Sequence, residues 1–521
     1  MSAISIFDIY KNFHPQAYHP HVTEVYSNFT NRSGKYAPDN KLGGVVNLGL
    51  TYFMKDFLIG EFGKFFNTPK KEAIKRHARV ISAMLGVEAN TERFEELHDI
   101  GYLPLEIKQV REGTIVPYGM PSFTIRSTDD RVAWLTNSIE TVCSSEIWQI
   151  QTSATTAANY KLNILRSAVK TGLHHDLVNW LCHDFSFRGM PGRHAAAASG
   201  FGHLTSFWGT DTVPAVFFAE DYYNADVDKE LVGGSVNATE HSVTCSWQDE
   251  GELEFVKYLM NVAAPTGILS IVADTWDFWN FVMKIIPKLK DDILKRDGKI
   301  VIRPDSGDPV EIICGIDARL ASDGNYYRKD CFGYYDAYDV SEEVIDGSEP
   351  LKEHEVKGLI EVLWDQFGGT VVNGYKHLDD HIGAIYGDSI TLQRQKEIIK
   401  RLEDKGFAPT VVFGIGSYTY QYVTRDTHGS AVKATNVVKS GVDTPIFKDP
   451  VTDPGKKSAK GLLFLGRDSD GEIFFEDNVS REREASEENL LQTVFLNGEI
   501  VQDESLSEIR KLIEEQLEKY L

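Results

Sequence analysis

Charged side chains follow a short apolar run near the middle of the chain. Residues 300–302 lead directly into Arg303-Pro304-Asp305-Ser306-Gly307, so Arg303 and Asp305 stand two residues apart. They share one face if the strand period continues through the proline. An arginine can hold a phosphate or stack on a planar ring, and an aspartate can hold ribose hydroxyls or a metal. The motif predicts a ligand site or, equally, an Arg–Asp ion pair that closes a turn.

A second motif with ring-binding chemistry is Asp184-Phe185-Ser186-Phe187-Arg188-Gly189. In a regular strand, Phe185 and Phe187 would share one side and Arg188 would lie on the other. An aromatic side chain can stack on a flat heterocycle. Taken alone, the pattern favours two core aromatics over a stacking site.

A glycine-led segment, 233–242, ends in Glu240-His241-Ser242. A Glu–His pair can perform acid–base or nucleophilic work. An isolated loop histidine is more often an ordinary surface residue, so a functional role for His241 depends on which residues lie around it.

A strand-like run at 411–413 enters Gly414-Ile415-Gly416-Ser417. Backbone N–H groups in such a segment can cradle a phosphate. The segment lacks the Gly-Lys-Ser/Thr ending of a Walker loop and the full dinucleotide spacing. Arg425 and Lys433 follow it, so basic residues collect after a candidate phosphate loop.

Five histidines offer another interpretation. His174, His175, His183, His194 and His203 cluster loosely in the sequence, and a metal hydrolase could use such residues. Neither H-x-H nor H-E-x-x-H spacing is present, so support for a metal hydrolase is weak.

Strand-like and helix-like segments alternate through the middle of the chain. We expect strands within 180–187, 213–218, 268–273, 300–302, 382–386 and 410–413, and helices within 277–290, 355–367 and 392–405. This alternation predicts a parallel α/β sheet, in which functional groups gather at the carboxyl ends of the strands. The charged or hydroxyl residues at these ends are Arg188, Asp274, Arg303, Asp305, Asp388 and Ser417. They favour an irregular TIM-like α/β barrel over an open doubly wound sheet.

The two ends of the chain have a mixed pattern. A helix is expected at 71–85, strands at 114–116 and 122–126, a hairpin at 461–475, and a final helix capped by Ser505 and Glu508. We therefore expect a mixed α+β domain built from residues 1–165 and 421–521. The barrel domain spans 166–420 and carries an acidic insertion near 317–352.

Composition excludes several classes of protein. The chain has 521 residues, with 54 Lys+Arg against 77 Asp+Glu and a formal net charge of −23. An acidic surface argues against nucleic-acid and anionic-membrane partners. We expect neither a secretory leader nor a membrane span, because no apolar run is long enough. The five cysteines lack C-x-x-C spacing, which argues against a disulfide framework or structural zinc and favours the cytoplasm.

The order of the motifs resembles that of the nicotinamide phosphoribosyltransferases, in the type II phosphoribosyltransferase group. The resemblance runs from Asp8-Ile9-Tyr10-Lys11 to Phe447-Lys448-Asp449-Pro450 and into the C-terminal helix, leaving out about 317–352. It also includes Gly209-Thr210-Asp211-Thr212, Gly387-Asp388 and Thr424-Arg425-Asp426. It implies an enzyme of NAD salvage that joins nicotinamide to 5-phosphoribosyl-1-pyrophosphate, giving nicotinamide mononucleotide and pyrophosphate. Mg²⁺ and coupled ATP hydrolysis are implied as well.

The resemblance also implies individual roles in a homodimer with shared active sites. The catalytic set is His241, Glu240, Asp305 and Arg303, with His241 as a phosphorylated histidine that Glu240 orients. Phe185 and the second subunit's Tyr10 sandwich the pyridine ring, and Asp211 accepts a hydrogen bond from the carboxamide. The remaining implied substrate contacts are Arg188, Arg32 and Asp274 at the pyrophosphate, Asp305 and Asp388 at the ribose and metal, Gly416, Ser417, Arg425 and Lys433 at the 5′-phosphate, and also Ser235, Ser270 and Gly387. Asp305 and Asp274 are candidates near Mg²⁺ without assured direct ligation.

Two positions depart from the family pattern, and two rival functions stay open. Ser417 follows the glycines, and Ala431 stands where the family has a phosphate-contacting serine. One rival is nicotinate phosphoribosyltransferase. Asp211 argues against it, because a carboxylate repels the carboxylate of nicotinate. The other rival is a catalytically silent barrel that acts as a binding or signalling protein. The presence of Arg303, Asp305 and His241 argues against it.

Overall fold

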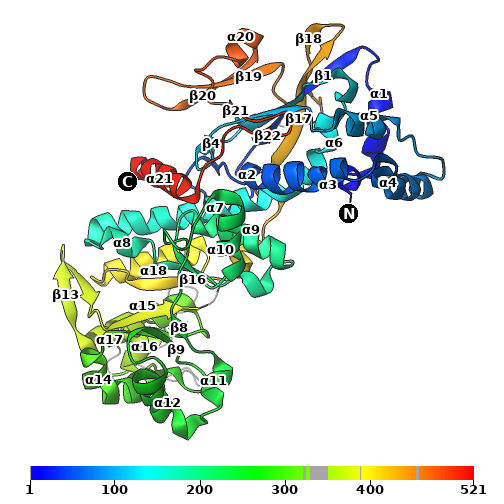
Figure 1. Ribbon diagram of the computed structural model, residues 1–521. Helices are drawn as coiled ribbons and strands as arrows, with labels where there is room; N and C mark the ends of the chain where they lie inside the picture. Colours follow the sequence, from blue (N-terminus) through cyan, green and yellow to red (C-terminus); the bar gives the residue numbers. More distant parts are fainter. Residues whose placement is uncertain (1, 321–323, 329–349, 388, 453–456) are drawn as a thin grey trace.

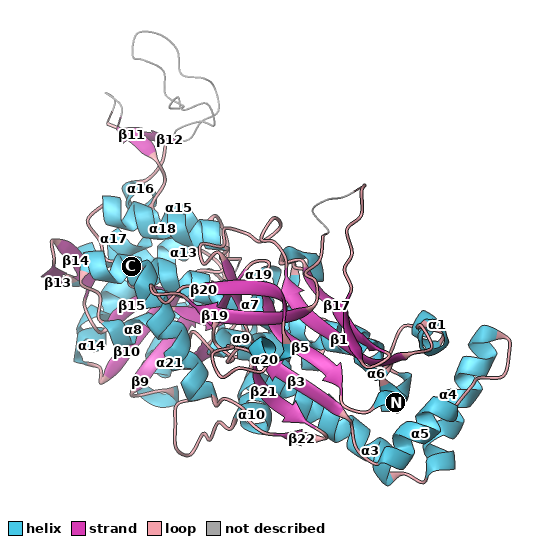
Figure 2. Ribbon diagram, turned by 90° about the horizontal axis from the view of Figure 1, so that it is seen from above, coloured by secondary structure: helices cyan, strands magenta, loops and turns pink. Residues whose placement is uncertain are grey.

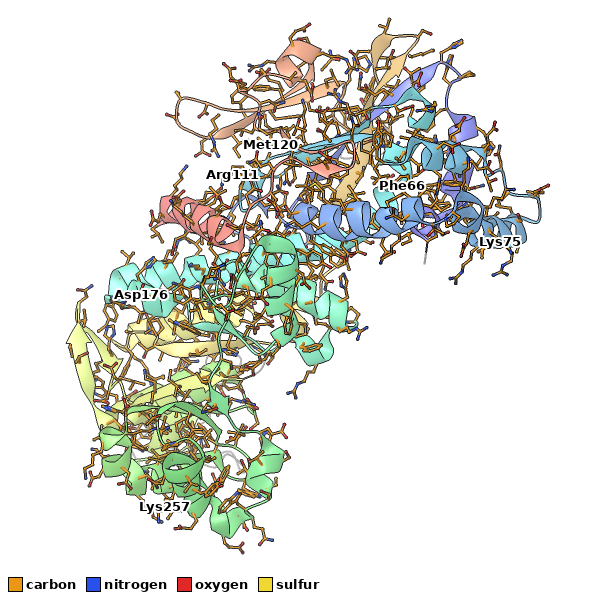
Figure 3. All side chains as sticks on the ribbon, viewed as in Figure 1. Phe66, Lys75, Arg111, Met120, Asp176 and Lys257 are labelled. Carbon is orange, nitrogen blue, oxygen red and sulfur yellow. The ribbon has the colours of Figure 1, made fainter. Side chains whose placement is uncertain are left out.

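The computed structural model describes residues 2–320, 324–328, 350–387, 389–452 and 457–521. Most of the acidic insertion and Asp388 lie outside these residues, so the expectations for them stay predictions. Two lobes are joined at the long helix α7, Glu140–Thr171 (Figure 1). Arg111 and Met120 mark the upper lobe, and Asp176 and Lys257 the lower one (Figure 3).

A seven-stranded antiparallel sheet forms the upper lobe. Its order is β18 (Val442–Pro445), β17 (Ser430–Lys439), β1 (Val22–Asn31), β5 (Pro121–Ser127), β3 (Leu105–Gln109), β21 (Gln492–Leu496) and β22 (Glu499–Ile500). Strand β1 lies between β17 and β5, so segments from both ends of the chain are side by side (Figure 2). Both chain ends thus build one layer, as the sequence predicts.

A curled parallel sheet forms the lower lobe. Its order is β7 (Gly209–Thr210), β6 (Cys182–Asp184), β16 (Val411–Ile415), β15 (Ile382–Tyr386), β10 (Gly298–Arg303), β9 (Gly267–Val272) and β8 (Asn237–Ala238). A parallel bridge between Gly209 and Gly234 brings the two edges of the sheet together. The expected irregular α/β barrel beside a mixed α+β layer is therefore confirmed.

Helices surround both sheets, and small two-stranded sheets complete the fold. The helices are α1 (His14–Ala17), α2 (Leu50–Phe53), α3 (Phe62–Asn67), α4 (Lys70–Leu85), α5 (Glu92–Ile100), α6 (Leu135–Ser138), α8 (His175–Val178), α9 (Arg193–Leu204), α10 (Val213–Tyr223), α11 (His241–Cys245), α12 (Glu252–Tyr258), α13 (Phe278–Asn280), α14 (Lys290–Lys295), α15 (Pro309–Cys314), α16 (Glu353–Lys357), α17 (Leu359–Phe367), α18 (Leu392–Asp404), α19 (Ser417–Gln421), α20 (Arg481–Glu484) and α21 (Leu506–Leu517). The small sheets pair β2 (Gly44–Val46) with β4 (Ile115–Pro117), β11 (Ala318–Leu320) with β12 (Tyr326–Arg328), β13 (Gly369–Val372) with β14 (Tyr375–Leu378), and β19 (Leu462–Arg467) with β20 (Ile473–Val479). Among the described residues, no helix has the length and apolar character needed to cross a bilayer.

One strand expectation is wrong. Residues 213–218 begin helix α10, with Pro214 in its first turn. A proline fits there because the first helical N–H groups need no partner within the helix. A short apolar run cannot distinguish a buried strand from a buried helix, and this one belongs to the helix.

Helix α7 joins the hydrophobic cores of the two lobes. Ile147 belongs to the core of the upper lobe, whereas Ile150 and Leu165 belong to the core of the barrel. Small residues dominate its buried middle, including Ala157 and Ala158, so neighbouring segments approach it closely. Residue 165, the expected boundary of the first segment, falls within this helix, and the division into domains remains a prediction.

The C-terminal helix has the predicted cap. The Ser505 hydroxyl accepts a hydrogen bond from the Glu508 N–H, and the Glu508 carboxylate accepts one from the Ser505 N–H. Ile509, Ile513 and Leu517 are fully buried and join the core of the barrel. Complete burial of each such side chain contributes about 1.5–3 kcal/mol, which holds α21 against the lower lobe.

Candidate active site

Strand β10 ends at a two-pronged ion pair. Arg303 donates from Nε to Asp305 Oδ1 at 3.0 Å and from Nη2 to Oδ2 at 2.9 Å. The Arg303 guanidinium carbon also lies 5.6 Å from the centre of the Phe185 ring. The ion-pair interpretation of the motif is therefore confirmed, and the ligand-site interpretation stays a prediction.

Gly387 makes this ion pair possible. A Cβ atom at this position would lie 1.9 Å from Asp305 Oδ1 and 3.0 Å from Arg303 Nε. The Gly387 N–H donates to the Pro304 carbonyl at 3.2 Å. Only glycine lets the end of β15 approach so closely.

Asp274 is a buried carboxylate beside this pair. Its Oδ2 accepts hydrogen bonds from the Asp305 N–H at 2.9 Å, the Ser306 N–H at 2.7 Å and the Ser306 hydroxyl at 2.5 Å. Its Oδ1 is buried and has no hydrogen-bond partner among the described residues. Because an unpaired buried carboxylate oxygen is costly, this atom is suited to a cation.

His241 lies over the same carboxylates at the start of α11. Its Nε2 is 3.9 Å from Asp274 Oδ1 and 4.0 Å from Asp305 Oδ2, and its side chain is half exposed. Its Nδ1 lies 3.1 Å from Thr275 Oγ1. Glu240 accepts a hydrogen bond from the Ser242 hydroxyl. Thr275, which sequence analysis did not single out, is thus the described hydrogen-bond partner of His241.

Asp211 is held by two donors at one oxygen. Its Oδ1 lies 2.8 Å from His183 Nε2 and accepts from the Ser235 hydroxyl at 2.5 Å. Burial alone would raise the pKa of Asp211, but the hydrogen bonds from His183 and Ser235 and the charge of Arg303 hold it below its ordinary value. Asp211 is therefore a carboxylate at neutral pH.

His183 is a site residue that sequence analysis considered only as a metal ligand. Its ring centre lies 4.6 Å from that of Phe185. The two residues are separated by one position in the sequence, so alternation along a strand was the signal that could have grouped them.

A cavity of about 540 Å³ lies inside the barrel. Phe185, Asp211, Ser235, Ser270 and Arg303 line it, and the Ser270 hydroxyl is buried without a hydrogen-bond partner in the described structure. The lining also includes Lys299 at the other end of β10, so the cavity extends along the strands. A flat polar ring would have aromatic, cationic and anionic neighbours at its mouth.

Arg188 and Ser417 adjoin this mouth. A second hollow, of about 360 Å³, is lined by Phe185, Phe187, Arg188, Asp211 and Thr212. Phe187 is exposed and Phe185 is partly buried, so the core-aromatic interpretation is wrong. A Cβ atom at Gly189 would lie 2.1 Å from Ser417 Oγ, which shows that the two segments touch.

A separate group of basic residues lies on the upper lobe. Lys433 on β17 is 3.9 Å from Glu140 Oε1, and Arg32 donates to the Gly429 carbonyl at 2.8 Å. Burial lowers the pKa of Lys433, and the charges of Arg32, Lys448 and Arg425 lower it further. Among the described side chains, no hydrogen bond or ion pair joins this group to the Arg303 group. The structure thus places two separate groups of charged residues on one chain.

Tyr10 lies on the same lobe, in a turn that is held in place by its neighbour. Its side chain is 59% exposed. The neighbouring Lys11 is buried and donates to the Asn137 carbonyl at 2.6 Å and to Glu140 Oε2 at 2.7 Å. The turn therefore holds an aromatic ring outward in solvent.

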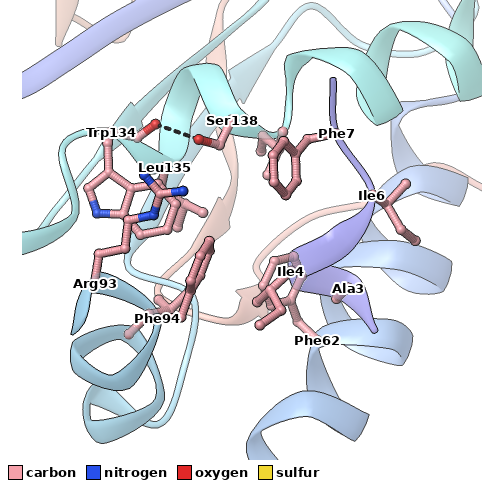
Figure 4. Close-up of a pocket in the computed structure, with 12 residues that line it drawn as sticks. Ala3, Ile4, Ile6, Phe7, Phe62, Arg93, Phe94, Trp134, Leu135 and Ser138 are labelled. Carbon is pink, nitrogen blue, oxygen red and sulfur yellow. Dashed lines mark hydrogen bonds between the residues drawn. The ribbon is translucent and has the colours of Figure 1, made fainter. Parts of the chain in front are cut away.

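Arg93 clamps the end of that turn. It donates to the Asn12 carbonyl and to Asn12 Oδ1, both at 2.7 Å. Its guanidinium lies over the Phe94 and Trp134 rings, beside a small apolar pocket of the upper lobe (Figure 4). This pocket supports the N-terminal segment and lacks the polar groups of the barrel cavity.

The histidines do not form a metal centre. Within the part of the chain that the structure describes, no three His, Cys, Asp or Glu side chains gather as metal ligands. His194 contacts Tyr52 and Glu146, and His203 contacts Tyr420. The metal-hydrolase interpretation has no support in this geometry.

Comparison with known proteins agrees with the motifs. The model of the nicotinate phosphoribosyltransferase family matches residues 180–499. A nicotinamide phosphoribosyltransferase of Acinetobacter baylyi is 44% identical over 536 residues, covering 100% of this chain and 98% of the relative. One of Mycoplasma pneumoniae is 31% identical over 477 residues, covering 87% of this chain and 93% of the relative.

Solved structures share the fold. Nicotinate-nucleotide pyrophosphorylase from Pyrococcus furiosus has a TM-score of 0.55 at 16% identity and covers 99% of this chain and 96% of its own. Human nicotinic acid phosphoribosyltransferase has a TM-score of 0.53 at 15% identity, with 98% and 93% covered.

These matches and the charged strand ends define the class as an enzyme that transfers a phosphoribosyl group. The chain belongs to the nicotinate phosphoribosyltransferase family. The resemblance drawn from the motifs is thereby confirmed at the level of the family.

Proposed function

We propose that this enzyme transfers the phosphoribosyl group of 5-phosphoribosyl-1-pyrophosphate to nicotinamide. The observation that carries the proposal is the Asp211 carboxylate at the mouth of a cavity shared with Phe185 and Arg303. A carboxylate accepts a hydrogen bond from a carboxamide –NH₂ and repels a carboxylate. Asp211 therefore selects nicotinamide over nicotinate, as the names of the two bacterial relatives also suggest.

The ring is held between aromatic faces in this proposal. Phe185 supplies one face, Arg303 packs at its edge, and Tyr10 of a second copy supplies the other face. The exposure of Tyr10 on its fixed turn supports a role outside its own chain. Ser235 and Ser270 offer hydroxyls to the carboxamide end of the cavity.

In this proposal, cations from the barrel and from the upper lobe bind the phosphate groups. Gly416 and Ser417 contact the 5′-phosphate, together with Arg425 and Lys433 of a second copy. Arg188 and Arg32 attract the pyrophosphate. The separation of the two cationic groups on one chain supports a homodimer with shared active sites, because each group alone lacks half of the binding residues.

The reaction is a substitution at C1 of the ribose. The pyridine nitrogen forms the new C–N bond while the bond from C1 to the pyrophosphate oxygen breaks and its electrons leave with pyrophosphate. A neutral pyridine nitrogen carries its own lone pair and needs no base. Catalysis consists of alignment and of positive charge beside the departing oxygens.

The carboxylates beside Arg303 fit a Mg²⁺ ion. Asp274 Oδ1 is buried and accepts no hydrogen bond from the described residues, and Mg²⁺ favours sites with one or two carboxylates plus substrate phosphates. Asp274 would hold the ion, with Asp305 close by and Asp388 as a further candidate. When bound, the ion neutralises charge on the pyrophosphate.

ATP hydrolysis is coupled through His241 in the proposal. Nε2 faces Asp274 and Asp305, and Nδ1 is engaged by Thr275. If Nδ1 donates to Thr275, Nε2 keeps its lone pair and can accept the γ-phosphoryl group as ADP leaves. Glu240, on the same loop, orients this segment. A phosphate there adds negative charge close to the metal candidates.

A reducing compartment suits the thiols. The four described cysteines are free, and three of them are buried. This supports work in the cytoplasm, where thiols stay reduced.

A product assay tests the proposal. The purified protein is incubated with nicotinamide, 5-phosphoribosyl-1-pyrophosphate and Mg²⁺, with and without ATP, and pyridine mononucleotides are separated and quantified. We expect nicotinamide mononucleotide and a higher yield with ATP. Absence of mononucleotide at high enzyme concentration supports the silent-barrel alternative, and preferential use of nicotinate supports the nicotinate enzyme.

A further inference from the structure

A fully buried histidine lies behind the cavity. His203, near the end of α9, has no exposed surface. Its Nδ1 lies 2.7 Å from the Tyr420 hydroxyl and its Nε2 lies 3.0 Å from the Gly209 carbonyl oxygen. Tyr420 on α19 is also buried. None of these groups faces the substrates in the proposed function, so the histidine has no evident chemical role there.

The hydrogen bonds define one form of the ring. A carbonyl oxygen only accepts hydrogen bonds, so Nε2 must carry the proton that is donated to Gly209. Nδ1 then accepts from the Tyr420 hydroxyl. Burial lowers the pKa of His203 to about 4, which keeps the ring neutral at physiological pH. His203 therefore bridges Tyr420 and Gly209 in a single tautomer, accepting a hydrogen bond from Tyr420 and donating one to Gly209.

The bridge connects the two ends of the substrate site. Gly209 starts β7, and Asp211 follows two residues later, with its own N–H donating to the Asp184 carbonyl at 3.0 Å. Tyr420 lies three residues after Ser417 on α19. One ring thus ties the strand end that carries the carboxamide acceptor to the helix that carries the 5′-phosphate contact.

We propose that His203 is a positioning residue that sets the distance between the carboxamide subsite at Asp211 and the phosphate subsite at Ser417. This inference rests on the proposed function, because nicotinamide mononucleotide spans both subsites. A ligand with two joined ends gains from a fixed spacing, whereas a fragment that fills one subsite does not. His203 acts through Gly209 and Tyr420 and does not contact the substrate.

Three probes separate positioning from a general loss of structure. Calorimetry measures the binding of nicotinamide, ribose 5-phosphate and nicotinamide mononucleotide to the unaltered dimer and to His203→Phe. We expect the Kd of the mononucleotide to rise about tenfold or more, while each fragment changes less than about threefold, because only the joined ligand depends on spacing. In turnover, kcat falls while the KM for nicotinamide changes little.

Tyr420→Phe is the second variant and removes only the hydroxyl. In this variant the Kd of the mononucleotide should again rise more than the Kd of either fragment, but by a smaller factor. If His203→Phe does not fold, Tyr420→Phe provides the test. His77→Phe is the matched control. His77 is also buried, pairs with Ser5 Oγ at 3.0 Å and has a pKa lowered to about 4 by burial, but it lies in the upper lobe. We expect this control to leave the ratio of mononucleotide to fragment affinities unchanged.

Two results overturn the inference. One is a fold-increase in the Kd of nicotinamide mononucleotide that is no larger than the product of the fold-increases in Kd for nicotinamide and ribose 5-phosphate. The other is unchanged mononucleotide binding in the folded variants. A failure of the proposed function is distinct, because the unaltered protein would then form no nicotinamide mononucleotide.

Discussion

Neighbouring residues fix and charge the Asp211 side chain, to which the proposed function assigns the carboxamide contact. His183 and Ser235 both contact Oδ1, so Oδ2 remains for a ligand. The same contacts hold the pKa of Asp211 below its ordinary value against the opposing effect of burial. The carboxylate is therefore charged and oriented before the substrate arrives.

Asp211→Asn should weaken the use of nicotinamide and let nicotinate compete. The lost charged acceptor corresponds to about 1.5–3 kcal/mol, or roughly 10- to 100-fold in kcat/KM for nicotinamide. Competition between the two substrates, followed by quantification of both mononucleotides, measures the effect. Asp470→Asn, at an exposed position between β19 and β20 of the upper lobe, is the control and should change neither value. An unaltered enzyme that already prefers nicotinate would contradict the role of Asp211.

His241→Ala should retain mononucleotide synthesis but lose its stimulation by ATP. The imidazole is proposed to accept the phosphoryl group and does not contact the ring or ribose in the synthesis step. Initial rates with and without ATP, together with ATP consumption, give the measurement. Full ATP coupling in this variant would falsify the phosphohistidine proposal.

At the scale of elements, backbone geometry decides what the strand ends can hold. The end of β15 lies against the Arg303–Asp305 pair only because position 387 has no side chain. The predicted parallel strands place these groups at one edge, as alternation of strands and helices indicated. The strand prediction for residues 213–218 was wrong because a short apolar run fits either a strand or a buried helix. In the folded chain this run forms the start of α10, which packs against α9.

Gly387→Ala should lower kcat/KM about 100-fold or more and leave the fold intact. The new methyl group would displace Asp305, and misplacement near the reacting groups by about 1 Å can cost this much. Gly63→Ala is the control, because position 63 in α3 is helical and has open space around its Cβ. Kinetics and thermal unfolding of both variants provide the measurement. Unchanged kcat/KM in Gly387→Ala would show that the ion pair tolerates displacement.

Across the whole molecule, the residues of the proposed shared site are divided between two lobes. Tyr10, Arg32 and Lys433 belong to the upper lobe, and Arg303 and His241 to the barrel. Helix α7 contributes to both hydrophobic cores, so the lobes are held together by shared packing. In the proposed homodimer, the upper lobe of one copy would complete the site on the barrel of the other.

Complementation tests the shared site. Tyr10→Ala and Arg303→Ala should each be inactive alone, because each damages both sites of a homodimer. Co-expressed with separate tags and randomly paired, they should recover about a quarter of normal activity, since half of the dimers then contain one intact site of two. No recovery in purified mixed dimers would mean that each site is built within one chain.

Glu112 should make stability depend on pH. Its Oε1 accepts from the Leu50 N–H at 2.7 Å and the Thr51 N–H at 3.2 Å. Burial, with a smaller contribution from Glu504, raises the pKa of Glu112 from 4.5 to about 7. The folded state therefore holds a proton that the unfolded state has released between pH 4.5 and 7, and the free energy of unfolding falls across this window by about 3 kcal/mol from this group.

Denaturant unfolding at several pH values measures this effect. Glu112→Gln keeps the acceptor oxygen but cannot ionise, so its stability should fall less between pH 4.5 and 7 than that of the unaltered protein. Glu92→Gln, at an exposed position, should keep the original dependence. Parallel curves for the Glu112→Gln variant and the unaltered protein would show that Glu112 does not titrate in this range.

Local features of this protein can be predicted from its sequence. The motifs around Arg303, Phe185 and His241, the strand–helix alternation and the cap at Ser505 follow from neighbouring residues, whose short-range preferences and periodicities are legible in one chain. Contacts between distant segments are seen only in the folded chain. They include the Gly209–Gly234 bridge that joins the sheet edges, the His183 and Ser235 contacts to Asp211, and the packing of α21 on the barrel. These pairings join segments that lie apart in the chain, and they form only where close packing of whole elements brings them into contact.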